Sequence, residues 1–510
     1  MSAIKTIGIV GAGAMGRGIA QIAAQSERDV LLFDLDGKVV DATIESLQKI
    51  WARQVEKQRM TQSQAKQALQ RIHKCLTLEQ LAGAGLVVEA VVERLDVKQK
   101  LFSTLESIVA PDCILASNTS SLSITAIARA CERPERVVGY HFFNPVPLMK
   151  VVEVIDGLRT HPQVSDELMA LARAMGHTPV RVKDMPGFLV NHAGRGMNVE
   201  GLKVAQECVA TFSQVDAIMR EQAGFRMGPF ELMDLTGLDV SHPVMESIYQ
   251  QFYDEPRFRP SPITAVRLQG NVLGRKTGEG FYAYVDGQKH VALEPAAPSL
   301  PQNLTVWVAP WHAVGHKRVA ALLKGLGVAI STAPMPPDDA LVLVTPYGED
   351  VASVVSRYRL PPERTVAIDT LFGLEQGRRR VVMCSDATLS RWRDAAHALM
   401  AADDTAVSVI ADSAGFVAQR MVATIVNVAC DIAQQGIATP DDIDIAVKLG
   451  LGYPQGPLSL GDSLGSGRIL EILRAMQTVT GDMRYRPSLW LQRRVQLGMP
   501  LTALSAWKLA

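Results

Sequence analysis

The stretch TIGIVGAGAMGRGIAQIAAQSERDVLLFD, residues 6–34, decides the fold that we expect for this chain. It begins with a short apolar run, continues through the glycine pattern GxGxxG at Gly11, Gly13 and Gly16, and then shows the apolar spacing of a helix. A strand, a glycine turn and a helix in this order open a parallel sheet that binds a dinucleotide, because the helix amino terminus faces the pyrophosphate. The next apolar run ends at Asp34, about 20 residues beyond Gly11, the offset at which an acid bonds the ribose hydroxyls. A carboxylate there repels a 2′-phosphate, so the sequence predicts NAD rather than NADP.

Polar residues follow each of the next apolar runs, where the predicted strands end. They are Glu93 and Lys98 after residues 86–92, Asn118 and Ser120 after residues 113–117, and His141 near the end of residues 137–142. Because ligands bind at the carboxyl edge of an open parallel sheet, we expect these side chains beside the glycine turn. For Ser120 alone, an N-cap of the helix that begins near Ile124 explains the residue nearly as well. A helix from Ser165 to Met175 and a strand over residues 177–183 are expected to close the sheet.

The segment GYHFFNPVPLMKVVE, residues 139–153, contains the residues that we expect to carry the chemistry. A turn with Pro145 and Pro147 separates two apolar runs, of which the first carries His141 and the second carries Glu153. A hairpin around this turn would bring imidazole and carboxylate side by side. A carboxylate on one ring nitrogen fixes the tautomer and leaves the other nitrogen to take a proton. A lone histidine in a buried strand most often serves packing, but the acid at the matching position favours a functional pair.

The composition is that of a globular protein without a strong electrostatic field. The chain has 510 residues, of which 47% are hydrophobic and 20% charged, and its formal net charge is zero. This length allows roughly three domains of about 150 residues, and zero net charge gives no general attraction to nucleic acid or membranes. No apolar run reaches the roughly 18 residues of a membrane span. The six cysteines show neither CxxC nor metal-ligand spacing, so we expect reduced thiols, no metal and a cytoplasmic location.

We expect no targeting signal at either end of the chain. A strand is expected to begin by about Ile4, which leaves no room for a signal peptide. The carboxyl-terminal residues 507–510 do not match a peroxisomal signal. Both observations agree with the cytoplasmic expectation.

Four motifs together resemble those of one enzyme family. GAGAMG at residues 11–16, SNTSS at 117–121, HFFNPVPLMKVVEV at 141–154 and DMPGFLVN at 184–191 are similar, in sequence and in order, to the 3-hydroxyacyl-CoA dehydrogenases. The resemblance extends over residues 4 to about 285. It implies an NAD-binding Rossmann-like domain over residues 1–186 and a helical domain for substrate binding or dimerisation over residues 187–285.

The resemblance also implies roles for individual residues. His141 would take the proton of the substrate 3-hydroxyl, and Glu153 would orient His141 and stabilise its imidazolium. Ser120 and Asn191 would bond the reacting oxygens, although Asn191 could also be a polar helix residue without a role. The positions that match cofactor contacts are Gly11, Gly13, Gly16, Asp34, Glu93, Lys98, Asn118, Ser120, Asn144 and Lys276. The positions that match coenzyme A contacts, more loosely, are Ser46 and Arg53.

Two of these regions also have a simpler explanation. Residues 37–72 show a long, polar helical pattern rich in lysine and arginine, which is typical of a solvated arm. The alternative is that some of its cations meet the phosphates of a bulky substrate. Lys276 lies in GRKTGEGFY, residues 274–282, where the simpler explanation is a surface turn.

The helical region recurs further along the chain. Asp184, Asp216, Gly228 and Asp234 correspond to Asp412, Asp444, Gly456 and Asp462, and all four pairs have the same separation, which we call the repeat offset. Chance does not hold one register over such a stretch, so we infer a duplicated helical unit.

Between the two copies, the chain shows the pattern of a reduced parallel sheet. The apolar runs are residues 305–309, 328–332, 340–345, 365–369 and 380–384. No glycine pattern follows the first run, Val382–Ser385 stand where we expect His141 to recur, and Gln419 takes the place of Asn191. We therefore expect the second half to bind no dinucleotide and to perform no redox step.

The predicted fold class is α/β plus all-α. It comprises an amino-terminal Rossmann-like domain (1–186), a helical domain (187–285), a linker (286–303), a degenerate, reduced Rossmann-like domain (304–405) and a second helical domain (406–510). This layout resembles long two-copy bacterial 3-hydroxybutyryl- and 3-hydroxyadipyl-CoA dehydrogenases, including those of phenylacetate breakdown. We hypothesise that the second helical unit packs on the first, as a partner subunit would in single-copy relatives.

The expected function is NAD-dependent oxidation of a short (3S)-3-hydroxyacyl-CoA. One alternative is a non-catalytic NAD-responsive binding protein, which would need the glycine turn and Asp34 but not His141 with Glu153. The other is a dehydrogenase of free 3-hydroxy acids, in which the basic arm would have no substrate phosphates to bind. The acyl group is either a four-carbon chain or a six-carbon chain that ends in a carboxylate. The second choice requires a cation, for which Arg195 and Lys150 are candidates. The expected partner is the acyl-CoA substrate, with homo-oligomers possible and neither nucleic acid nor membrane expected.

Overall fold

The computed structural model describes residues 4–504. Residues 507–510, for which we expect no targeting signal, lie outside this range. The contacts within the chain divide it into two compact units. Unit 1 consists of Met1–His192 and Gln435–Leu451, and unit 2 consists of Ala193–Gln434 and Gly452–Ala510. No helix within the described range is long and apolar enough to cross a membrane.

Unit 1 is built on an eight-stranded sheet in the order β3-β2-β1-β4-β5-β6-β7-β8. The strands are β1 (Thr6–Val10), β2 (Asp29–Phe33), β3 (Ile72–Cys75), β4 (Leu86–Glu89), β5 (Ile114–Ser117), β6 (Val137–Phe142), β7 (Val151–Asp156) and β8 (Thr178–Lys183). All neighbours are parallel except β6 and β7, which form the expected antiparallel hairpin. Strand β4 ends earlier than expected because the chain turns at Glu89, whose carboxylate accepts a hydrogen bond from the Val91 N–H at 2.7 Å.

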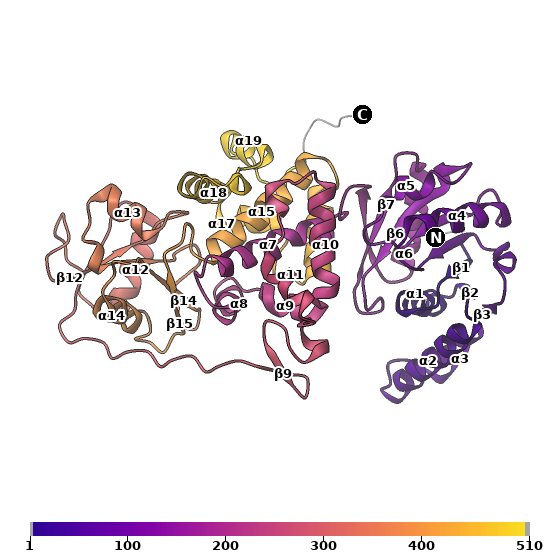
Figure 1. Cartoon of the computed structure of the whole chain (residues 1–510), viewed down its shortest axis with the longest axis horizontal. Helices are drawn as coiled ribbons and strands as arrows, with labels where there is room; N and C mark the ends of the chain where they lie inside the picture. Colours follow the sequence, from indigo (N-terminus) through magenta and orange to yellow (C-terminus); the bar gives the residue numbers. More distant parts are fainter. Residues whose placement is uncertain (1–3, 505–510) are drawn as a thin grey trace. The chain divides into compact units, whose positions relative to one another are not determined.

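Helices of unit 1 cover the sheet and extend from it (Figure 1). They are α1 (Ala14–Gln25), α2 (Gly37–Glu56), α3 (Gln62–Gln70), α4 (Leu95–Ile108), α5 (Ile124–Ala128) and α6 (Pro162–Ala174). Ile19 on α1 and Leu168 on α6 are fully buried in one core with the strands. Helices α2 and α3 form the predicted arm, which Trp51 attaches to the same core.

Helix α6 begins earlier than the expected start at Ser165. Its first residue is Pro162, and the His161 side chain caps it by accepting from the Gln163 N–H. The fixed φ of proline suits the first helical position, and here this preference outweighs the capping preference of serine. Ser165 is instead buried inside the helix, where its hydroxyl donates to Asp156.

A segment of the second repeat completes unit 1. Helix α16 (Pro440–Leu451) packs against β8 and β7. The N–H of Lys183, at the end of β8, donates to the carbonyl of Ile437 at 2.9 Å. A Cβ on Gly450 would come within 2.9 Å of the Val190 side chain, so the close approach of α16 requires glycine there.

Unit 2 contains the helices of both repeats and a second sheet. The helices of the first repeat are α7 (Val190–Gln206), which starts in unit 1, α8 (Phe212–Glu221), α9 (Pro229–Thr236), α10 (Leu238–Gln251) and α11 (Pro262–Gln269). Those of the second repeat are α15 (Ala418–Gln434), α17 (Pro457–Leu464), α18 (Ser466–Thr480) and α19 (Leu489–Leu497). A small hairpin of β9 (Ala283–Val285) and β10 (Gln288–His290) extends into the predicted linker.

The two helical repeats pack on each other along α7 and α15. A Cβ on Gly196 would lie 3.0 Å from the Cα of Ile425, so the two helix backbones approach closely. Arg420 is buried on α15 and donates to Glu200 at 2.7 Å and to Glu207 at 2.6 Å. These carboxylates compensate the cost of burying the guanidinium. The second helical repeat therefore packs on the first, as the sequence repeat suggested.

The second sheet has five strands in the order β11-β12-β13-β14-β15. They are β11 (Thr305–Val308), β12 (Ala340–Val344), β13 (Thr365–Ile368), β14 (Arg380–Cys384) and β15 (Val407–Ala411), and helices α12 (Ala313–Gly325), α13 (Val351–Tyr358) and α14 (Ser390–Met400) pack with them. Residues 328–332 were expected to form a strand but make a single bridge, between Ile330 and Val306. Strand β15 was not expected, and it lies beyond residue 405 in the segment assigned to the second helical domain.

The strand register of the second sheet shows which residue corresponds to His141, and it is not the expected one. In unit 1, His141 on β6 stands opposite Glu153 on β7. Strands β13 and β14 are antiparallel in the same register, and the Asp369 N–H donates to the carbonyl of Val381 at 3.1 Å. At the repeat offset, Asp369 takes the place of His141 and Val381 that of Glu153. The expectation of Val382–Ser385 was wrong, because an apolar run alone does not show which strand of a hairpin it represents.

The place of the histidine in the second half is filled by a buried amide–carboxyl contact. Gln419 donates to Asp369 at 3.0 Å, and its side-chain oxygen accepts from the Gly348 N–H at 2.8 Å. Burial raises the pKa of Asp369. The second half therefore has neither the imidazole nor its acid partner at this position.

Each sheet is extended by a segment of the other repeat. In unit 2 the N–H of Ala411, at the end of β15, donates to the carbonyl of Val209 at 3.0 Å. Ala411 is the counterpart of Lys183 at the repeat offset, and Ile437 is the counterpart of Val209. This bond therefore repeats the Lys183–Ile437 bond of unit 1 with the repeats exchanged. The two halves of the chain are thus interwoven by a reciprocal exchange.

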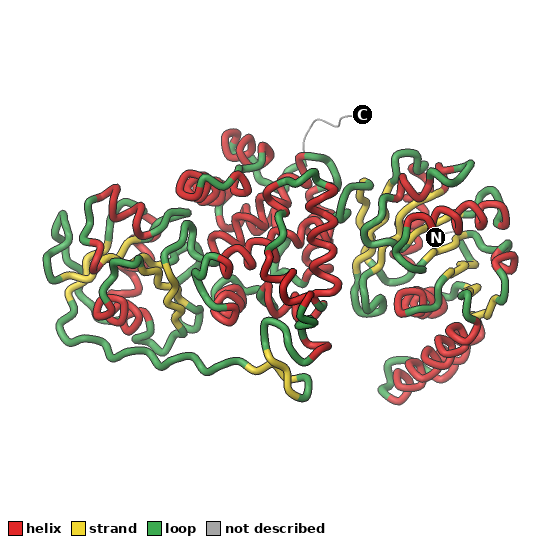
Figure 2. Tube along the Cα trace, viewed as in Figure 1, coloured by secondary structure: helices red, strands yellow, loops and turns green. Residues whose placement is uncertain are grey.

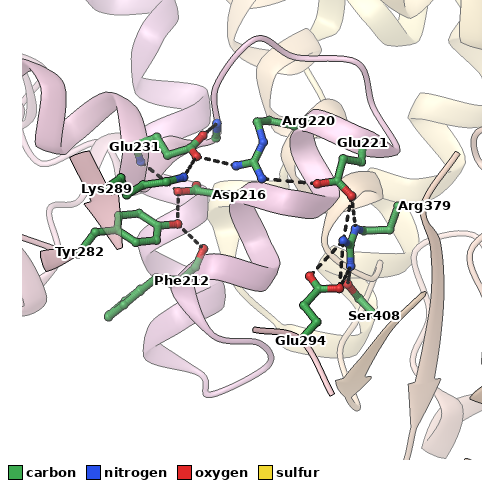
Figure 3. A network of polar contacts seen from close by, with 11 residues as sticks. Phe212, Asp216, Arg220, Glu221, Glu231, Tyr282, Lys289, Glu294, Arg379 and Ser408 are labelled. Carbon is green, nitrogen blue, oxygen red and sulfur yellow. Dashed lines mark hydrogen bonds and ion pairs between the residues drawn. The ribbon is translucent and has the colours of Figure 1, made fainter. Parts of the chain in front are cut away.

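A network of ion pairs connects the linker to α8 and to the second sheet (Figure 3). Arg379, beside β14, contacts Glu221 of α8 at 2.7 Å and Glu294 of the linker at 2.9 Å. Glu221 also pairs with Arg220 at 3.4 Å. Residues 291–304 otherwise run without helix or strand (Figure 2). The buried guanidinium of Arg379 therefore holds an irregular segment to two structured elements.

Candidate active site

His141 and Glu153 form a buried pair across the β6–β7 hairpin. His141 Nδ1 lies 2.6 Å from Glu153 Oε2, and the two side chains are 6% and 0% exposed. The rings of Phe143 and Phe188 lie 4.4 and 5.9 Å from the imidazole, measured between ring centroids. A carboxylate that accepts from Nδ1–H keeps the proton on that nitrogen, so Nε2 is the atom able to take a proton from another group.

The second oxygen of Glu153 holds the start of α7. Oε1 accepts from the N–H groups of Leu189 and Val190 at 2.9 and 2.8 Å. These N–H groups lie at the amino-terminal end of a helix, where a negative charge is stabilised by the helix dipole. Because Asn191 follows directly in the same helix, one carboxylate fixes both the imidazole and the first turn that carries Asn191.

The glycine turn has the shape that a dinucleotide requires. Gly11 has φ of +104°, and a Cβ there would lie 2.5 Å from the Ala90 carbonyl oxygen. A Cβ on Gly16 would lie 1.8 Å from the Gly11 carbonyl oxygen, whereas no atom lies within 4 Å of a Cβ on Gly13. The space over Gly13 is open, and Gly13 is the N-cap of α1 without a side-chain cap. The N–H groups of this helix end thus face a position that a pyrophosphate can occupy.

Asp34 lies beside the glycine turn, as the spacing predicted. Its Oδ2 accepts from the Ala12 N–H at 2.8 Å, and its Oδ1 accepts from the Asp36 N–H at 3.2 Å. These two bonds hold the carboxylate at the end of β2. The residues of the turn and Asp34 therefore fit an NAD molecule, with the turn at its pyrophosphate and Asp34 at its adenosine ribose.

Glu93 is the acceptor that shapes the loop after β5. Its Oε1 accepts from Thr119 Oγ1 at 2.7 Å, from the Ser120 N–H at 2.9 Å and from the Ser121 N–H at 3.2 Å. The Ser120 hydroxyl also donates to it, at 3.3 Å. Burial raises the pKa of Glu93, but the charge of Lys98 and these hydrogen bonds outweigh burial and hold the pKa below its ordinary value. Glu93 therefore stays ionised and positions Ser120.

A buried ion pair beneath this loop was not anticipated from the sequence. Lys98 lies 2.5 Å from Glu89 and 3.2 Å from Glu93, and Lys98 and Glu89 are 1% and 0% exposed. The other oxygen of Glu89 accepts from Ser117 at 2.6 Å. The signal in the sequence was an acid inside the apolar run LVVEAVV at residues 86–92, a position where a charge requires a partner.

Two asparagines occupy the ends of β5 and β6. The side-chain oxygen of Asn118 accepts from the Phe142 N–H at 2.9 Å, which holds the two strand ends together directly after His141. Asn144 is exposed in the turn that follows β6, and its peptide bond to Pro145 is cis. Both lie just beyond the carboxyl ends of their strands, at positions where the resemblance implies cofactor contacts.

The remaining predicted residues belong to helix α2 and to unit 2. Ser46 on α2 accepts from Arg17 at 3.4 Å, and Arg53 is exposed in the last turn of the same helix. Lys276 belongs to unit 2, where it forms an ion pair with Asp239. The structure thus brings together the residues around His141 and the glycine turn within unit 1, and places Lys276 outside that unit.

A mostly parallel sheet with an open glycine turn, an acid at the end of β2 and a buried histidine–carboxylate pair is an arrangement typical of nicotinamide-dependent dehydrogenases. Comparisons with known proteins narrow this class. Residues 6–185 match the family description "3-hydroxyacyl-CoA dehydrogenase, NAD binding domain", and residues 187–284 and 415–502 match "3-hydroxyacyl-CoA dehydrogenase, C-terminal domain". The chain belongs to the 3-hydroxyacyl-CoA dehydrogenase family, whose members are NAD-dependent oxidoreductases. The second match of the carboxyl-terminal description agrees with the duplication.

Individual relatives cover the chain to different extents. The chain is 36% identical to 3-hydroxyadipyl-CoA dehydrogenase of Escherichia coli K12 over 497 residues, which are 97% of this chain and 98% of the relative. It is 42% identical to a probable 3-hydroxybutyryl-CoA dehydrogenase of Bacillus subtilis, over 55% of this chain and 98% of the relative. The crystal structure of 3-hydroxybutyryl-CoA dehydrogenase from Escherichia coli K12 matches with a TM-score of 0.85 and 34% identity, over 97% of this chain and 98% of that chain.

Proposed function

We propose that this chain oxidises the 3-hydroxyl of a short (3S)-3-hydroxyacyl-CoA to a ketone, with His141 as the general base. The observation that carries the proposal is the buried contact of 2.6 Å between His141 Nδ1 and Glu153 Oε2. Oxidation of an alcohol requires that its proton leaves as hydride is transferred, and a histidine near neutrality suits that task. NAD, held by the glycine turn and Asp34, would supply the acceptor for that hydride.

The protein groups act on the proton and on the reacting oxygens. His141 Nε2 takes the hydroxyl proton, while Glu153 retains the tautomer and stabilises the imidazolium that forms. Ser120 and Asn191 donate hydrogen bonds to the substrate oxygens. Ser120 is supported in this role by Glu93, which fixes its backbone N–H at 2.9 Å. Asn191 is supported by the bonds of Glu153 to the N–H groups of Leu189 and Val190.

Two acyl groups are supported by the names of relatives. One Escherichia coli relative that spans almost the whole chain is named for 3-hydroxyadipyl-CoA, whereas the Escherichia coli crystal structure and the Bacillus subtilis relative are named for 3-hydroxybutyryl-CoA. We propose that this chain accepts acyl chains of this size, with Ser46 and Arg53 on the α2 arm at the coenzyme A moiety. A cytoplasmic location and the absence of a membrane or nucleic-acid partner belong to the same proposal, as does the assignment of domain boundaries at residues 186, 285 and 303.

The alternatives explain less of the structure. A protein that only binds NAD has no use for a fully buried carboxylate on a histidine beside the glycine-turn edge. A dehydrogenase of free 3-hydroxy acids would leave the α2 arm without a ligand.

The direct test is the absorbance of NADH with purified protein. We expect oxidation of NADH with acetoacetyl-CoA, and reduction of NAD with (3S)-3-hydroxybutyryl-CoA or (3S)-3-hydroxyadipyl-CoA. The (3R) enantiomers and free 3-hydroxybutyrate are the controls and are expected to react far more slowly. Turnover of free 3-hydroxybutyrate at the rate of the thioester, or no turnover of any thioester, would refute the proposal.

A further inference from the structure

Glu89 is a buried acid inside the first sheet. It is the last residue of β4, which lies between β1 and β5, and its side chain is 0% exposed. Burying a carboxylate is costly, and a buried ion pair usually adds no more stability than apolar side chains of similar volume. The stability of the sheet therefore gives no reason for an acid at this position.

One oxygen of Glu89 bonds directly to the loop that follows β5. We call residues 117–121 the Ser120 loop. Oε2 of Glu89 accepts from the Ser117 hydroxyl at 2.6 Å, and the Ser117 oxygen accepts in turn from the Thr119 N–H at 3.2 Å. All three side chains are buried, and hydrogen bonds that are shielded from water in this way are strong. The start of the Ser120 loop is therefore fixed to the end of β4.

The other oxygen of Glu89 acts on the same loop through Lys98. Oε1 of Glu89 lies 2.5 Å from Lys98 Nζ, and this ammonium lies 3.2 Å from Glu93 Oε2. Lys98 is 1% exposed, so the two carboxylates rather than water determine where its charge lies. Glu93 Oε1 accepts from the Ser120 N–H at 2.9 Å. Both oxygens of Glu89 thus lead to the Ser120 loop.

The second sheet has an apolar residue at the position of Ser117. At the repeat offset, Ala367 on β13 is the counterpart of Gly139 on β6. Gly139 stands opposite Ser117 of β5, and Ala367 stands opposite Val344 of β12. The strand register therefore places a buried valine where the first sheet has the serine that bonds to Glu89.

The position of Glu89 is apolar in the second sheet as well. Strands β11 and β12 pair in parallel, as β4 and β5 do, and their register places Ala309, directly after β11, beside Val344. Ala309 is buried. The half that lacks a counterpart of His141 therefore closes the same part of its sheet with apolar side chains. This difference indicates that Glu89 serves the active site rather than the fold.

We propose that Glu89 is a positioning residue, which holds the Ser120 loop where Ser120 meets the substrate. This inference rests on the proposed function, in which Ser120 donates a hydrogen bond to a substrate oxygen. Glu89 is fully buried and acts through Ser117 and Lys98. A displacement of about 1 Å in a group that positions the substrate can cost about 10²-fold in rate, so a small movement of the loop is measurable.

The test is a double-mutant cycle of Glu89→Gln and Ser120→Ala, measured as kcat with saturating NAD and (3S)-3-hydroxybutyryl-CoA. Glutamine retains the shape of Glu89 but removes the charge that pairs with Lys98. We expect kcat of Glu89→Gln to be at least about tenfold below that of the wild-type enzyme. In the Ser120→Ala background the same change should cost less than about threefold, because the effects of residues that act through one another are not additive.

The cycle separates positioning from a general loss of structure. A structural defect lowers the amount of active protein by the same factor whether or not Ser120 is present. Equal factors in the two backgrounds, or an unchanged kcat in Glu89→Gln, would overturn the inference. A wild-type protein that turns over no thioester, or a Ser120→Ala variant with normal kcat, would instead count against the proposed function.

A milder change covers the case in which Glu89→Gln does not fold. Ser117→Ala removes only the hydroxyl through which Glu89 reaches the loop. The matched control is Ser107→Ala on α4, whose exposed hydroxyl donates to the carbonyl of Thr104 at 2.7 Å. We expect kcat of Ser117→Ala to fall at least about threefold, the scale of one hydrogen bond, while the control stays at the wild-type value. A folded Ser117→Ala protein with the kcat of the control would contradict the inference.

Discussion

Glu153 is bonded through both of its carboxylate oxygens, and each bond fixes a different part of the site. Oε2 contacts His141 at 2.6 Å, and Oε1 accepts from the N–H groups of Leu189 and Val190. A single fully buried side chain therefore determines the imidazole tautomer and the first turn of α7. Loss of the charge affects the two tasks unequally, because an amide oxygen can still accept from a backbone N–H.

Replacing Glu153 by glutamine tests this division. The amide oxygen of Glu153→Gln can still hold α7, but the neutral amide does not stabilise an imidazolium. We expect kcat to fall by about 10²-fold or more, within the range in which general bases contribute. The melting temperature, measured by scanning calorimetry, should change little. A variant with nearly normal kcat, or one that fails to fold, would contradict the assigned division of tasks.

Single residues were predictable where their spacing carried information. His141 and Glu153 could be paired because they lie at equal distances on either side of one turn. Asp34 could be identified because its offset from the glycine turn is characteristic of the acid that bonds the ribose. Glu89 was missed because its function arises from burial beside Lys98, and no spacing in the sequence reveals which lysine reaches a buried acid. The counterpart of His141 in the second half was missed for a similar reason. Only strand register distinguishes Asp369 from Val382.

At the scale of elements, Asp216 anchors α9 in the first helical repeat. Its carboxylate accepts from the N–H groups of Phe230 and Glu231 at 3.0 and 2.9 Å, and from the Tyr282 hydroxyl at 2.6 Å. Figure 3 shows it beside the ion pairs of Arg220 and Glu231. Burial raises the pKa of Asp216 from 3.8 to about 7, although the hydrogen bond from Tyr282 opposes the change.

The raised pKa of Asp216 predicts a pH dependence of stability. A folded state that binds the proton more tightly than the unfolded chain is stabilised at low pH and loses that contribution as pH rises from about 3.8 through 7. In Asp216→Asn this titration is absent. We expect the melting temperature of the wild-type protein to decline relative to Asp216→Asn across this interval, as measured by differential scanning fluorimetry. A constant difference between the two proteins at all pH values would refute the prediction.

The boundaries of elements were less predictable than their order. Strand β6 has its expected ends, Val137 and Phe142, and β1 ends directly before Gly11, where the glycine turn begins. Helix α6 begins before the expected residue because Pro162 and Ser165 are both plausible start signals and tertiary contacts decide between them. Residues 328–332 form a single bridge although their apolar pattern suggests a strand, since pairing depends on partners that the pattern does not contain.

At the scale of the whole molecule, the two halves depend on each other. Helix α16 of the second repeat covers β7 and β8 of unit 1, and α15 packs on α7 within unit 2. The sequence repeat predicted that the helical copies pack together. The repeat did not predict that a segment of each repeat bonds to the sheet of the other repeat. The offset between corresponding residues is the same whether a segment packs within its own repeat or against the other one.

Deletion of residues 304–510 tests this dependence. The truncated chain would lack α15, whose Ile425 and Met421 lie beside Gly196 and Gly201 of α7, and would expose that face of α7. Each buried apolar side chain that becomes exposed costs about 1.5–3 kcal/mol, so we expect precipitation or self-association that covers the same face. Size-exclusion chromatography with light scattering on the truncated and full-length proteins provides the measurement. A truncated protein that is soluble, monomeric and fully active would show that the second half is dispensable.

The account as a whole depends on His141 as the base, and the most direct measurement is made on His141→Gln. Turnover of (3S)-3-hydroxybutyryl-CoA would be followed by NADH absorbance, and NAD affinity would be measured on the same preparation by calorimetry. We predict a loss of about 10²–10⁴-fold in kcat, with NAD affinity retained because the glycine turn and Asp34 are untouched. Turnover close to that of the wild-type enzyme, with NAD still bound, would contradict the account.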